Sequence, residues 1–442
     1  MRKPPALGYV IFLFVALIAS HLFAREISAA RVTQSFAPTV CPAPGNDGVT
    51  TALVPNKRVQ VHDVVGGKQN VKFKNAGNIS RQVGKVPLLI AGNPGTTFAL
   101  QTKTGVWTGG TICTTGISDS WFVGGSADIT GQSVLSLVNS GLSDAIIKVI
   151  VYSEKGRGSE LSYTVKQSSQ KDIRLDSITP GSTAVALHLT TQTGRVTSYL
   201  FDERKKGLRN FGGDYVNAQD EATQEVFIGG VPTFAGKGVK VTHRIRLMNA
   251  SDVATAASIQ IANRSGVITP VGLDAVDLKP GIVREIPLDG ELGNDPLSIK
   301  IVADQKIVAS VYTYIESKSK RDFLWSTPSE SNNELDRGPI ALNLNGLEPT
   351  LTLASDKIDV TVKWTNFNGK MSSTSLRSLD VINWKVPANT RTVSIERNRK
   401  AAPLSGGGFI WSSTSGFGFL PLKSGAVLEV STRPISNAGT IS

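Results

Sequence analysis

The sequence has few of the residues that most often build catalytic and metal sites. Its 442 residues include four histidines, two cysteines and three methionines, and only 19% are charged. The patterns HExxH, HxH and CxxC are absent, so there is no recognisable zinc site. The GxSxG elbow, the GxxxxGK(S/T) loop and a GxGxxG turn leading into a helix are also missing. We therefore expect no catalytic residue, bound cofactor or metal.

Long amphipathic helices are also missing from the pattern, since no extended stretch repeats apolar residues with a period of about 3.6. Glycine is instead abundant, at 43 residues, and short segments rich in Val, Ile, Thr and Ser alternate apolar with polar positions. Leu135 and Leu137 are one example, and Ile245 and Leu247 are another. A period of two indicates strands with one buried face, which predicts an all-β chain.

The amino-terminal segment has the composition of an export signal. Arg2 and Lys3 precede an apolar run from Leu7 to Ala24, an order typical of a segment that inserts with its basic end in the cytoplasm. Cleavage after Ala30 and retention as a helical membrane anchor both fit this segment. In either case we expect an extracytoplasmic protein, secreted or anchored to the membrane by residues 1–30.

The two cysteines, Cys41 and Cys113, are expected to form a structural disulfide. A single pair in an oxidising compartment usually pairs, and neither has the surroundings of a reactive thiol. The formal net charge of +12 favours anionic envelope polymers and lipid headgroups. Nucleic acid is not indicated because Lys and Arg are scattered, and the cluster Arg204-Lys205-Lys206 is more simply a solvated loop.

An internal repeat organises the middle of the chain. Trp121-Phe122-Val123-Gly124-Gly125 matches Val226-Phe227-Ile228-Gly229-Gly230, and each is followed by a strand that ends in Asn, at Asn139 and Asn249. Four further strand-like segments recur in the same order, which indicates a duplicated module of roughly 105 residues. Trp121, Phe122 and Phe227 are interpreted as structural aromatic residues, packed where one module ends and the next begins.

These patterns predict tandem antiparallel β-sandwich, immunoglobulin-like modules after an N-terminal membrane or signal helix. The expected divisions are a signal peptide or anchor at 1–30, a β-rich unit with the cysteine pair at 31–120, β-sandwich repeats at 121–225 and 226–325, and a degenerate β-rich module at 326–442. The Gly-Gly pairs mark bends at sheet corners, because no helix follows to make a phosphate-binding loop.

Three sets of side chains are weighed for chemistry or binding. Acidic residues in aromatic or Gly-rich surroundings are interpreted first as turn and cap carboxylates and second as glycosidase acids: Asp119, Asp214, Asp289 and Asp322. Four tryptophans are interpreted first as core residues and alternatively as a platform on which a sugar could stack: Trp107, Trp121, Trp325 and Trp411. The histidines beyond the apolar run have no catalytic motif around them: His62, His188 and His243.

Several of these features occur together in one family. They are Cys41-Pro42, Cys113, the Trp121-to-Gly125 strand, the strand ending at Asn139, and Gly213-Asp214. With them the chain resembles an actinobacterial family of large secreted proteins of unknown function with WFVGG-type β-rich repeats. The resemblance covers roughly residues 36–330. It implies an extracytoplasmic location, a Cys41–Cys113 bridge and a β-rich body, and it brings no catalytic or binding residues.

The sequence thus favours a non-enzymatic extracytoplasmic cell-envelope protein, a structural and interaction scaffold of tandem β-sandwiches. Its expected partner is an envelope protein or an anionic wall polymer, with the membrane as a further contact if the N-terminal segment is retained. The alternative is an accessory glycan-binding protein or a glycan-acting wall enzyme with Asp/Glu catalysis. A groove with paired acids and Trp would favour the alternative, and a flat surface would favour the scaffold.

Overall fold

The computed structural model shows an all-β chain whose strands pair antiparallel. The described part contains one 3-10 turn, η1 (Leu175–Ser177), and no α-helix. Strands β1 (Gln34–Phe36) and β32 (Val427–Glu429) pair with each other in a unit of residues 1–36 and 427–442, and all other strands belong to a second unit, residues 37–426. The structure describes residues 34–36, 38–45, 48–55, 59–64, 74–75, 80–92, 95–233, 238–288, 292–293, 295–317, 320–329, 339–342, 347–398, 404–413, 415–423 and 427–429.

The N-terminal module contains two four-stranded sheets, ordered β2-β7-β4-β5 and β6-β3-β8-β9. Its strands are β2 (Thr39–Cys41), β3 (Val49–Leu53), β4 (Gln60–Asp63), β5 (Lys74–Asn75), β6 (Ser80–Gln82), β7 (Leu88–Ala91), β8 (Phe98–Lys103) and β9 (Trp107–Ile112).

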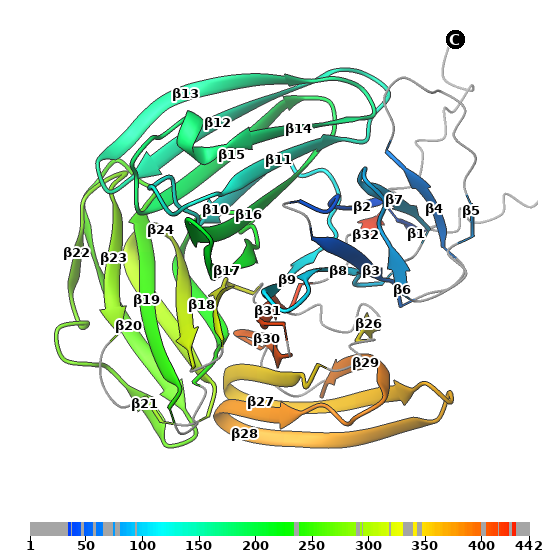
Figure 1. Ribbon diagram of the computed structural model, residues 1–442. Helices are drawn as coiled ribbons and strands as arrows, with labels where there is room; N and C mark the ends of the chain where they lie inside the picture. The colour runs from blue at the N-terminus through cyan, green and yellow to red at the C-terminus, as the bar shows by residue number, and fades with distance from the viewer. Residues whose placement is uncertain are drawn as a thin grey trace, which may run out of the picture. The chain divides into compact units, whose positions relative to one another are not determined.

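The first repeat also contains two four-stranded sheets, ordered β10-β15-β12-β13 and β14-β11-β16-β17 (Figure 1). Its strands are β10 (Asp119–Val123), β11 (Val134–Asn139), β12 (Ala145–Ser153), β13 (Gly156–Val165), β14 (Ser169–Arg174), β15 (Val185–Thr193), β16 (Val196–Lys206) and β17 (Arg209–Val216).

The second repeat has the corresponding pairings in a single eight-stranded sheet, because one continuous strand, β24, takes part in both halves. Its strands are β18 (Thr223–Val231), β19 (Lys240–Asn249), β20 (Thr255–Asn263), β21 (Gly266–Ile268), β22 (Val276–Leu278), β23 (Val283–Leu288), β24 (Leu297–Glu316) and β25 (Arg321–Ser326).

The C-terminal module is dominated by a long hairpin of two strands, β27 and β28, drawn in yellow and orange at the bottom of Figure 1. Its strands are β26 (Ile340–Ala341), β27 (Thr350–Asn366), β28 (Met371–Lys385), β29 (Thr390–Arg397), β30 (Gly406–Ser412) and β31 (Phe417–Pro421).

All four modules pair their strands in one order. We number the strand positions of each module from one to eight in chain order. Hydrogen-bonded neighbours then follow the order 1-6-3-4 in one half of the module and 5-2-7-8 in the other. Long strands supply two positions each: β24 the sixth and seventh, β27 the second and third, and β28 the fourth and fifth. An immunoglobulin sandwich instead pairs its first strand with the second and its last with the sixth. Compared with the immunoglobulin sandwich, the first strand here lies in the sheet of the sixth, and the seventh strand lies in the sheet of the second.

The alternating residues of both halves meet in a common core within each repeat. In the first repeat, Val149 and Leu187 come from one sheet and Leu135 from the other, and all three are fully buried. In the second repeat, Ile259 and Ile245 occupy the corresponding places. Burial of each such side chain contributes about 1.5–3 kcal/mol, so the period-two pattern fixes which face of every strand points inward.

The two Asn residues that end the second strands explain part of the repeated sequence. The side-chain amide of Asn139 donates to the carbonyls of Ser143 and Val165, at 2.8 and 3.0 Å, and its oxygen accepts from the Gly141 amide. Asn249 repeats this pattern with three equivalent main-chain groups. Each Asn therefore satisfies buried main-chain groups of the turn between the second and third strands and of the fourth strand.

The structure corrects the alignment of the two aromatic strands by one residue. Phe122 pairs with Leu187 and enters the core of the first repeat, whereas Phe227 pairs with Lys300 and points away from its own core. Trp121, not Phe122, is therefore the structural counterpart of Phe227. Matching the Gly-Gly pairs misled the sequence alignment, because a shift of one residue reverses the face of every side chain on a strand.

The eighth strands of the four modules form a closed set of contacts. Strand β9 contacts β17, β17 contacts β25, β25 contacts β31, and β31 contacts β9. Three of these labels, β9, β17 and β31, stand close together in Figure 1. The N-terminal and C-terminal modules also share one apolar cluster, in which Phe98 and Ile112 pack with Phe409 and Leu420. The first and last modules are thus packed against each other as closely as successive ones.

Cys41 and Cys113 form a disulfide, as the sequence predicts. The bond joins β2, the first strand of the N-terminal module, to the residue that follows β9, and it lies beside an antiparallel bridge between Val40 and Thr114. No helix in the described part of the chain is long and apolar enough to cross a membrane. The predicted signal or anchor helix, residues 1–30, lies outside the described residues.

Replacing both cysteines with serine is expected to lower the free energy of unfolding by about 4 kcal/mol, because the bond closes a long loop in the unfolded chain. The separation of the two cysteines is 72 residues. Urea unfolding of the oxidised protein, of the double variant and of the reduced wild type measures the effect. Equal midpoints for all three would show that the bond adds nothing, and mass mapping without reductant checks the linkage itself.

Candidate functional site

Two of the acidic residues selected from the sequence, Asp214 and Asp322, lie in the closed set of eighth strands. Asp214 on β17 accepts hydrogen bonds from the amides of Gly110 on β9, at 3.1 Å, and Trp325 on β25, at 2.9 Å. Its side chain is fully buried. Burial raises the pKa of Asp214 well above its ordinary value, although the backbone donors oppose the shift. One carboxyl group thus connects three modules.

Asp322 makes the next connection. Its oxygens accept from the backbone amides of Phe323, at 2.9 Å, Gly213 on β17, at 3.3 Å, and Phe417 on β31, at 2.9 Å. It is also fully buried, and burial raises its pKa well above the ordinary value. Neither carboxyl group has solvent access, so neither can reach a dissolved substrate. Their geometry is that of connectors between strands.

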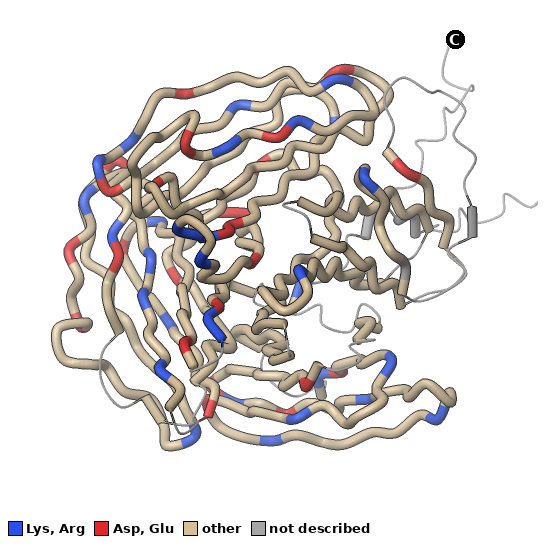
Figure 2. The backbone as a smooth tube through the Cα atoms, in the orientation of Figure 1, with Lys and Arg blue, Asp and Glu red and all other residues tan. Residues whose placement is uncertain are grey.

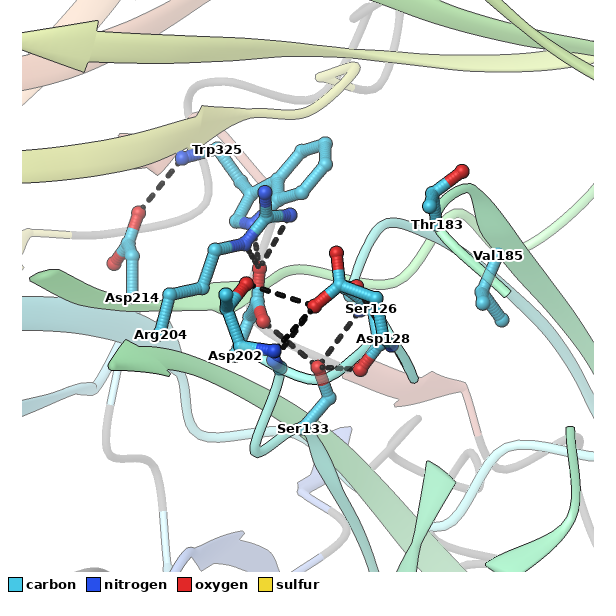
Figure 3. A network of polar contacts seen from close by, with 12 residues as sticks. Ser126, Asp128, Ser133, Thr183, Val185, Asp202, Arg204, Asp214 and Trp325 are labelled. Atoms are coloured by element: carbon cyan, nitrogen blue, oxygen red, sulfur yellow. Dashed lines mark hydrogen bonds and ion pairs between the residues drawn. The ribbon is translucent and has the colours of Figure 1, made fainter. Parts of the chain in front are cut away.

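A third buried carboxylate, Asp202 on β16, organises the contact between the two repeats (Figure 3). It accepts from the Ser133 hydroxyl at 2.7 Å, from the Trp325 indole at 3.1 Å and from the Arg204 guanidinium at 3.1 Å. Arg204 lies over the Tyr312 ring, 4.5 Å from its centre. An ion pair of this kind is stable in the interior only when its remaining polar atoms are satisfied, as they are here.

Arg246 on β19 reaches from the second repeat into the first. Its fully buried guanidinium donates to the carbonyls of Gly125, Thr183 and Val185, and it forms an ion pair with Glu285 on the adjacent strand β23. Its charged group lies 4.8 Å from the centre of the Trp325 ring. Burial alone would raise the pKa of Glu285, but the positive charge of Arg246 keeps it below the ordinary value.

All four tryptophans selected from the sequence are buried, with no more than 6% of any side chain exposed. Trp107 donates its indole N–H to Glu203, which is itself 1% exposed, and so joins the N-terminal module to the first repeat. Trp411 packs in the apolar cluster shared by the N-terminal and C-terminal modules. Since a sugar must reach the ring face to stack on it, the four rings serve as packing groups and not as a binding platform.

Trp121 occupies the junction between the repeats. Its ring stacks on His188, with centres 3.9 Å apart and planes inclined by 7°, and it packs in a cluster with Met248 and Val308 of the second repeat. The Asp119 carboxylate and His188 Nε2 form a hydrogen bond at 3.0 Å on the partly exposed rim of this contact. The last acidic candidate, Asp289, lies outside the described residues.

The other two histidines are placed differently. His243 is buried on β19 beside the Thr313 hydroxyl, at 3.0 Å, and burial lowers its pKa to about 4. His62 lies on β4, and its Nδ1 is 2.8 Å from the Asp63 carbonyl oxygen. Among the described residues, no group of three or more His, Cys, Asp or Glu is placed to hold a metal ion.

A groove of about 370 Å³ lies at the junction of three modules and is called here the junction groove. One wall is formed by residues 219–221 of the link from the first repeat to the second and by the first half of β18, as far as Phe227. The segment that follows β25 supplies Pro328 and Ser329, and the C-terminal module supplies Ser405 and Lys423. No local pattern indicates this groove, because its walls come from segments that are far apart along the chain.

The wall of the junction groove is held at both ends. The backbone of Gln219 exchanges two hydrogen bonds with Trp121, at 2.7 and 2.8 Å. On the other side, the Lys423 ammonium donates to the Ala218 carbonyl at 2.7 Å and to the Asp220 carboxylate at 3.0 Å. The link is therefore fixed both to the first repeat and to the C-terminal module.

The junction groove is acidic in a basic protein. Asp220, Glu221 and Glu225 line it, against the single cation Lys423. Glu225 also pairs with Lys300 at 3.2 Å, while Glu221 is exposed and makes no ion pair with any residue that the structure describes. Sequence reasoning missed these acids, since in the alternating pattern they resemble ordinary solvated residues.

Replacing Asp214 with Asn is expected to destabilise the protein by about 1–3 kcal/mol, because the amide places a second donor beside a backbone N–H. The raised pKa also sets a pH dependence. The contribution of neutral Asp214 is complete below the unfolded pKa of about 3.9 and is lost as pH rises through the folded pKa.

Thermal unfolding across a pH series measures both effects. The wild type should lose stability relative to Asp214→Asn as the pH increases, while Asp277→Asn, an exposed control on β22, should follow the wild type. Parallel pH profiles for the wild type and Asp214→Asn would contradict this assignment.

Comparison with known proteins places the chain in a family. No curated protein matches it. A family model described as a family of unknown function, DUF5719, matches residues 88–383, from strand β7 of the N-terminal module to strand β28 of the C-terminal module. The match therefore includes both repeats, Asp214, Asp322 and most of the junction groove. Since it covers more than half of the 442 residues, the chain belongs to the DUF5719 family of unknown function.

Proposed function

We propose that this protein is a non-enzymatic scaffold of the cell envelope that acts outside the cytoplasm and presents binding surfaces to a partner. The observation that carries the proposal is that the buried acids accept hydrogen bonds from neighbouring modules. Asp202, Asp214 and Asp322 are all fully buried and bonded across module boundaries, so the groups best suited to acid–base catalysis are committed to structure. A body of four packed modules is suited to presenting surfaces to a partner.

The proposal includes the finer features expected from the sequence. Each module is a variant of the immunoglobulin-like sandwich, and the two repeats arose by duplication of one module in a WFVGG-type family of actinobacterial secreted proteins. The matching strand order and the equivalent Asn139 and Asn249 networks support the duplication. The apolar run after Arg2 and Lys3 supports export, with residues 1–30 either removed or kept as an anchor.

Two kinds of partner fit the surface. Figure 2 shows Lys and Arg distributed along the strands of the repeats and the C-terminal module, and the net charge of +12 favours an anionic wall polymer. The acidic junction groove favours an envelope protein that carries positive charge. The alternative function, glycan binding or glycan hydrolysis by Asp/Glu chemistry, has support from Glu221 and Glu225 in that groove, although its aromatic side chain is Phe227 and not a tryptophan.

Cross-linking in intact cells followed by capture of the full chain tests the scaffold proposal. We expect a defined envelope protein or wall fragment in the captured material, and no release of sugar when the purified protein is incubated with cell walls. Release of soluble glycan that is lost in both Glu221→Gln and Glu225→Gln would overturn the scaffold in favour of the hydrolase. The exposed variant Glu160→Gln serves as the matched control.

Trp121→Ala tests the structural assignment of the repeat junction. We expect a loss of about 3–5 kcal/mol of stability, because a large buried ring is removed from the contact between the repeats. Partner capture, measured per folded molecule, should stay close to the wild-type level. Unchanged melting together with lost capture would make Trp121 a binding residue. Phe417, the first residue of β31, packs against a cluster that includes Leu324 of the second repeat and offers a comparison at a different module junction.

A further inference from the structure

We propose that the turn between β16 and β17, together with the adjacent turn at residues 128–131, docks on a membrane surface that carries anionic lipid headgroups. The inference rests on the proposed location in the cell envelope and adds a contact to the partners proposed above. The β16–β17 turn consists of Gly207 and Leu208, and Lys206 and Arg209 pair with each other on either side of it. The Leu208 side chain is fully exposed.

The electrostatics of the β16–β17 turn favour an anion. Lys206 and Arg209 are exposed and lie directly opposite each other, and like charges in that position repel. Lys205 and Lys206 form no ion pair with any residue that the structure describes. Arg209 lies 3.9 Å from Glu316, but the same carboxylate oxygen is only 2.6 Å from Arg321. An anionic headgroup among these cations would relieve the repulsion.

The turn at residues 128–131 brings a second aliphatic side chain to the same place. The carbonyl of Thr130 accepts from the amide of Lys205 at 3.0 Å, so this turn lies alongside the end of β16. The Asp128 carboxylate accepts from two backbone amides of its own turn, at 2.7 and 2.9 Å, which holds the turn and occupies the acid. Ile129 projects from it with 94% of its side chain exposed. The two turns thus present two exposed aliphatic groups beside cations without partners.

This combination favours a membrane over a soluble anionic polymer or an acidic protein surface. A single exposed aliphatic side chain is ordinary on a protein surface, and cations alone would suit any polyanion. A bilayer satisfies both kinds of group, because lysines stay at the headgroups while neighbouring aliphatic side chains enter the acyl boundary. Leu208 and Ile129 would then leave water when the lysines meet the headgroups.

The β16–β17 hairpin is also tied to the modules on either side. Lys103 on β8 pairs with Glu203 at 3.6 Å, and Arg209 reaches Glu316 on β24. Glu203 is 1% exposed and also accepts from the Trp107 indole, so this acid does not offset the lysines of the turn. Docking through a surface that is already ordered avoids the entropy cost of ordering a loop.

The test places a fluorescent reporter on the turn itself, because the apolar run from Leu7 to Ala24 can bind a membrane independently of the turn. The full chain with Leu208→Cys is labelled with the environment-sensitive dye NBD, and the two native cysteines do not react because they form the disulfide. We expect a blue shift with vesicles of equal phosphatidylglycerol and phosphatidylcholine, and none with phosphatidylcholine alone. The same label at Leu142→Cys should stay in water, because Leu142 is exposed at the opposite end of the first repeat.

Two sets of substitutions separate the ionic contact from the apolar one. With the label at position 208, Lys205→Gln and Lys206→Gln should each raise the lipid concentration for half-maximal shift about fivefold. With the label at Ile129→Cys, Leu208→Ser should raise it about tenfold, because an aliphatic group no longer enters the bilayer. Lys166→Gln, an exposed lysine at the opposite end of the repeat, is the matched control and should change nothing. Unchanged melting temperatures would show that these surface substitutions leave the fold intact.

An equal half-maximal concentration for Leu208→Ser and its parent would overturn the membrane contact in favour of a purely ionic one, as expected for a polymer or an acidic protein. A shift of the same size with phosphatidylcholine alone would overturn the role of the cations. If the label at position 208 stays in water while cross-linked capture of a partner persists, this inference fails and the scaffold proposal stands. A blue shift in a protein that captures no partner would support the membrane contact and remove the scaffold.

Discussion

The structure depends on the contact among the eighth strands of its four modules. Each of these strands brings main-chain amides into a buried interior, and an unpaired amide there costs about 1–3 kcal/mol. Asp214 and Asp322 supply acceptors to strands of neighbouring modules, so the contact is satisfied only when the modules are assembled together. The N-terminal module closes the set because its Phe98 and Ile112 pack in the same apolar cluster as the C-terminal module.

This arrangement gives a structural explanation for the buried acids Asp214 and Asp322, whose raised pKa values would otherwise suggest catalysis. A buried carboxyl group with a strongly raised pKa is a feature of many active sites, but structural networks produce it too. Here the raised pKa values of Asp214 and Asp322 arise from burial, and both groups are occupied by backbone donors from adjacent strands. Arg246 and Trp325 likewise have a structural role, because each donates a hydrogen bond from the second repeat to a buried acceptor of the first. The acids of the junction groove differ from these buried carboxyl groups, since Glu221 is exposed to solvent.

The junction groove exists because modules meet there. Its wall includes a link held by Trp121 from one module and by Lys423 from another, so the groove is a product of the assembly. The packing of the modules therefore both stabilises the protein and creates the groove. A single isolated module would contain neither the complete groove nor the acceptors that support the eighth strands.

The sequence by itself determined the elements that depend on local pattern. Alternating apolar residues specified strands and their buried faces, as at Leu135 and Ile245, and the single cysteine pair specified the disulfide. Local pattern could not fix the register of the aromatic strands, because Gly-Gly pairs match equally well when the faces are reversed, as Phe122 and Phe227 show. Only the tertiary structure decided that Asp214 and Asp322 are buried connectors, that the first and seventh strands exchange sheets, and that Gln219 and Glu221 share a groove. These features depend on groups that are distant along the chain and meet only when the modules pack.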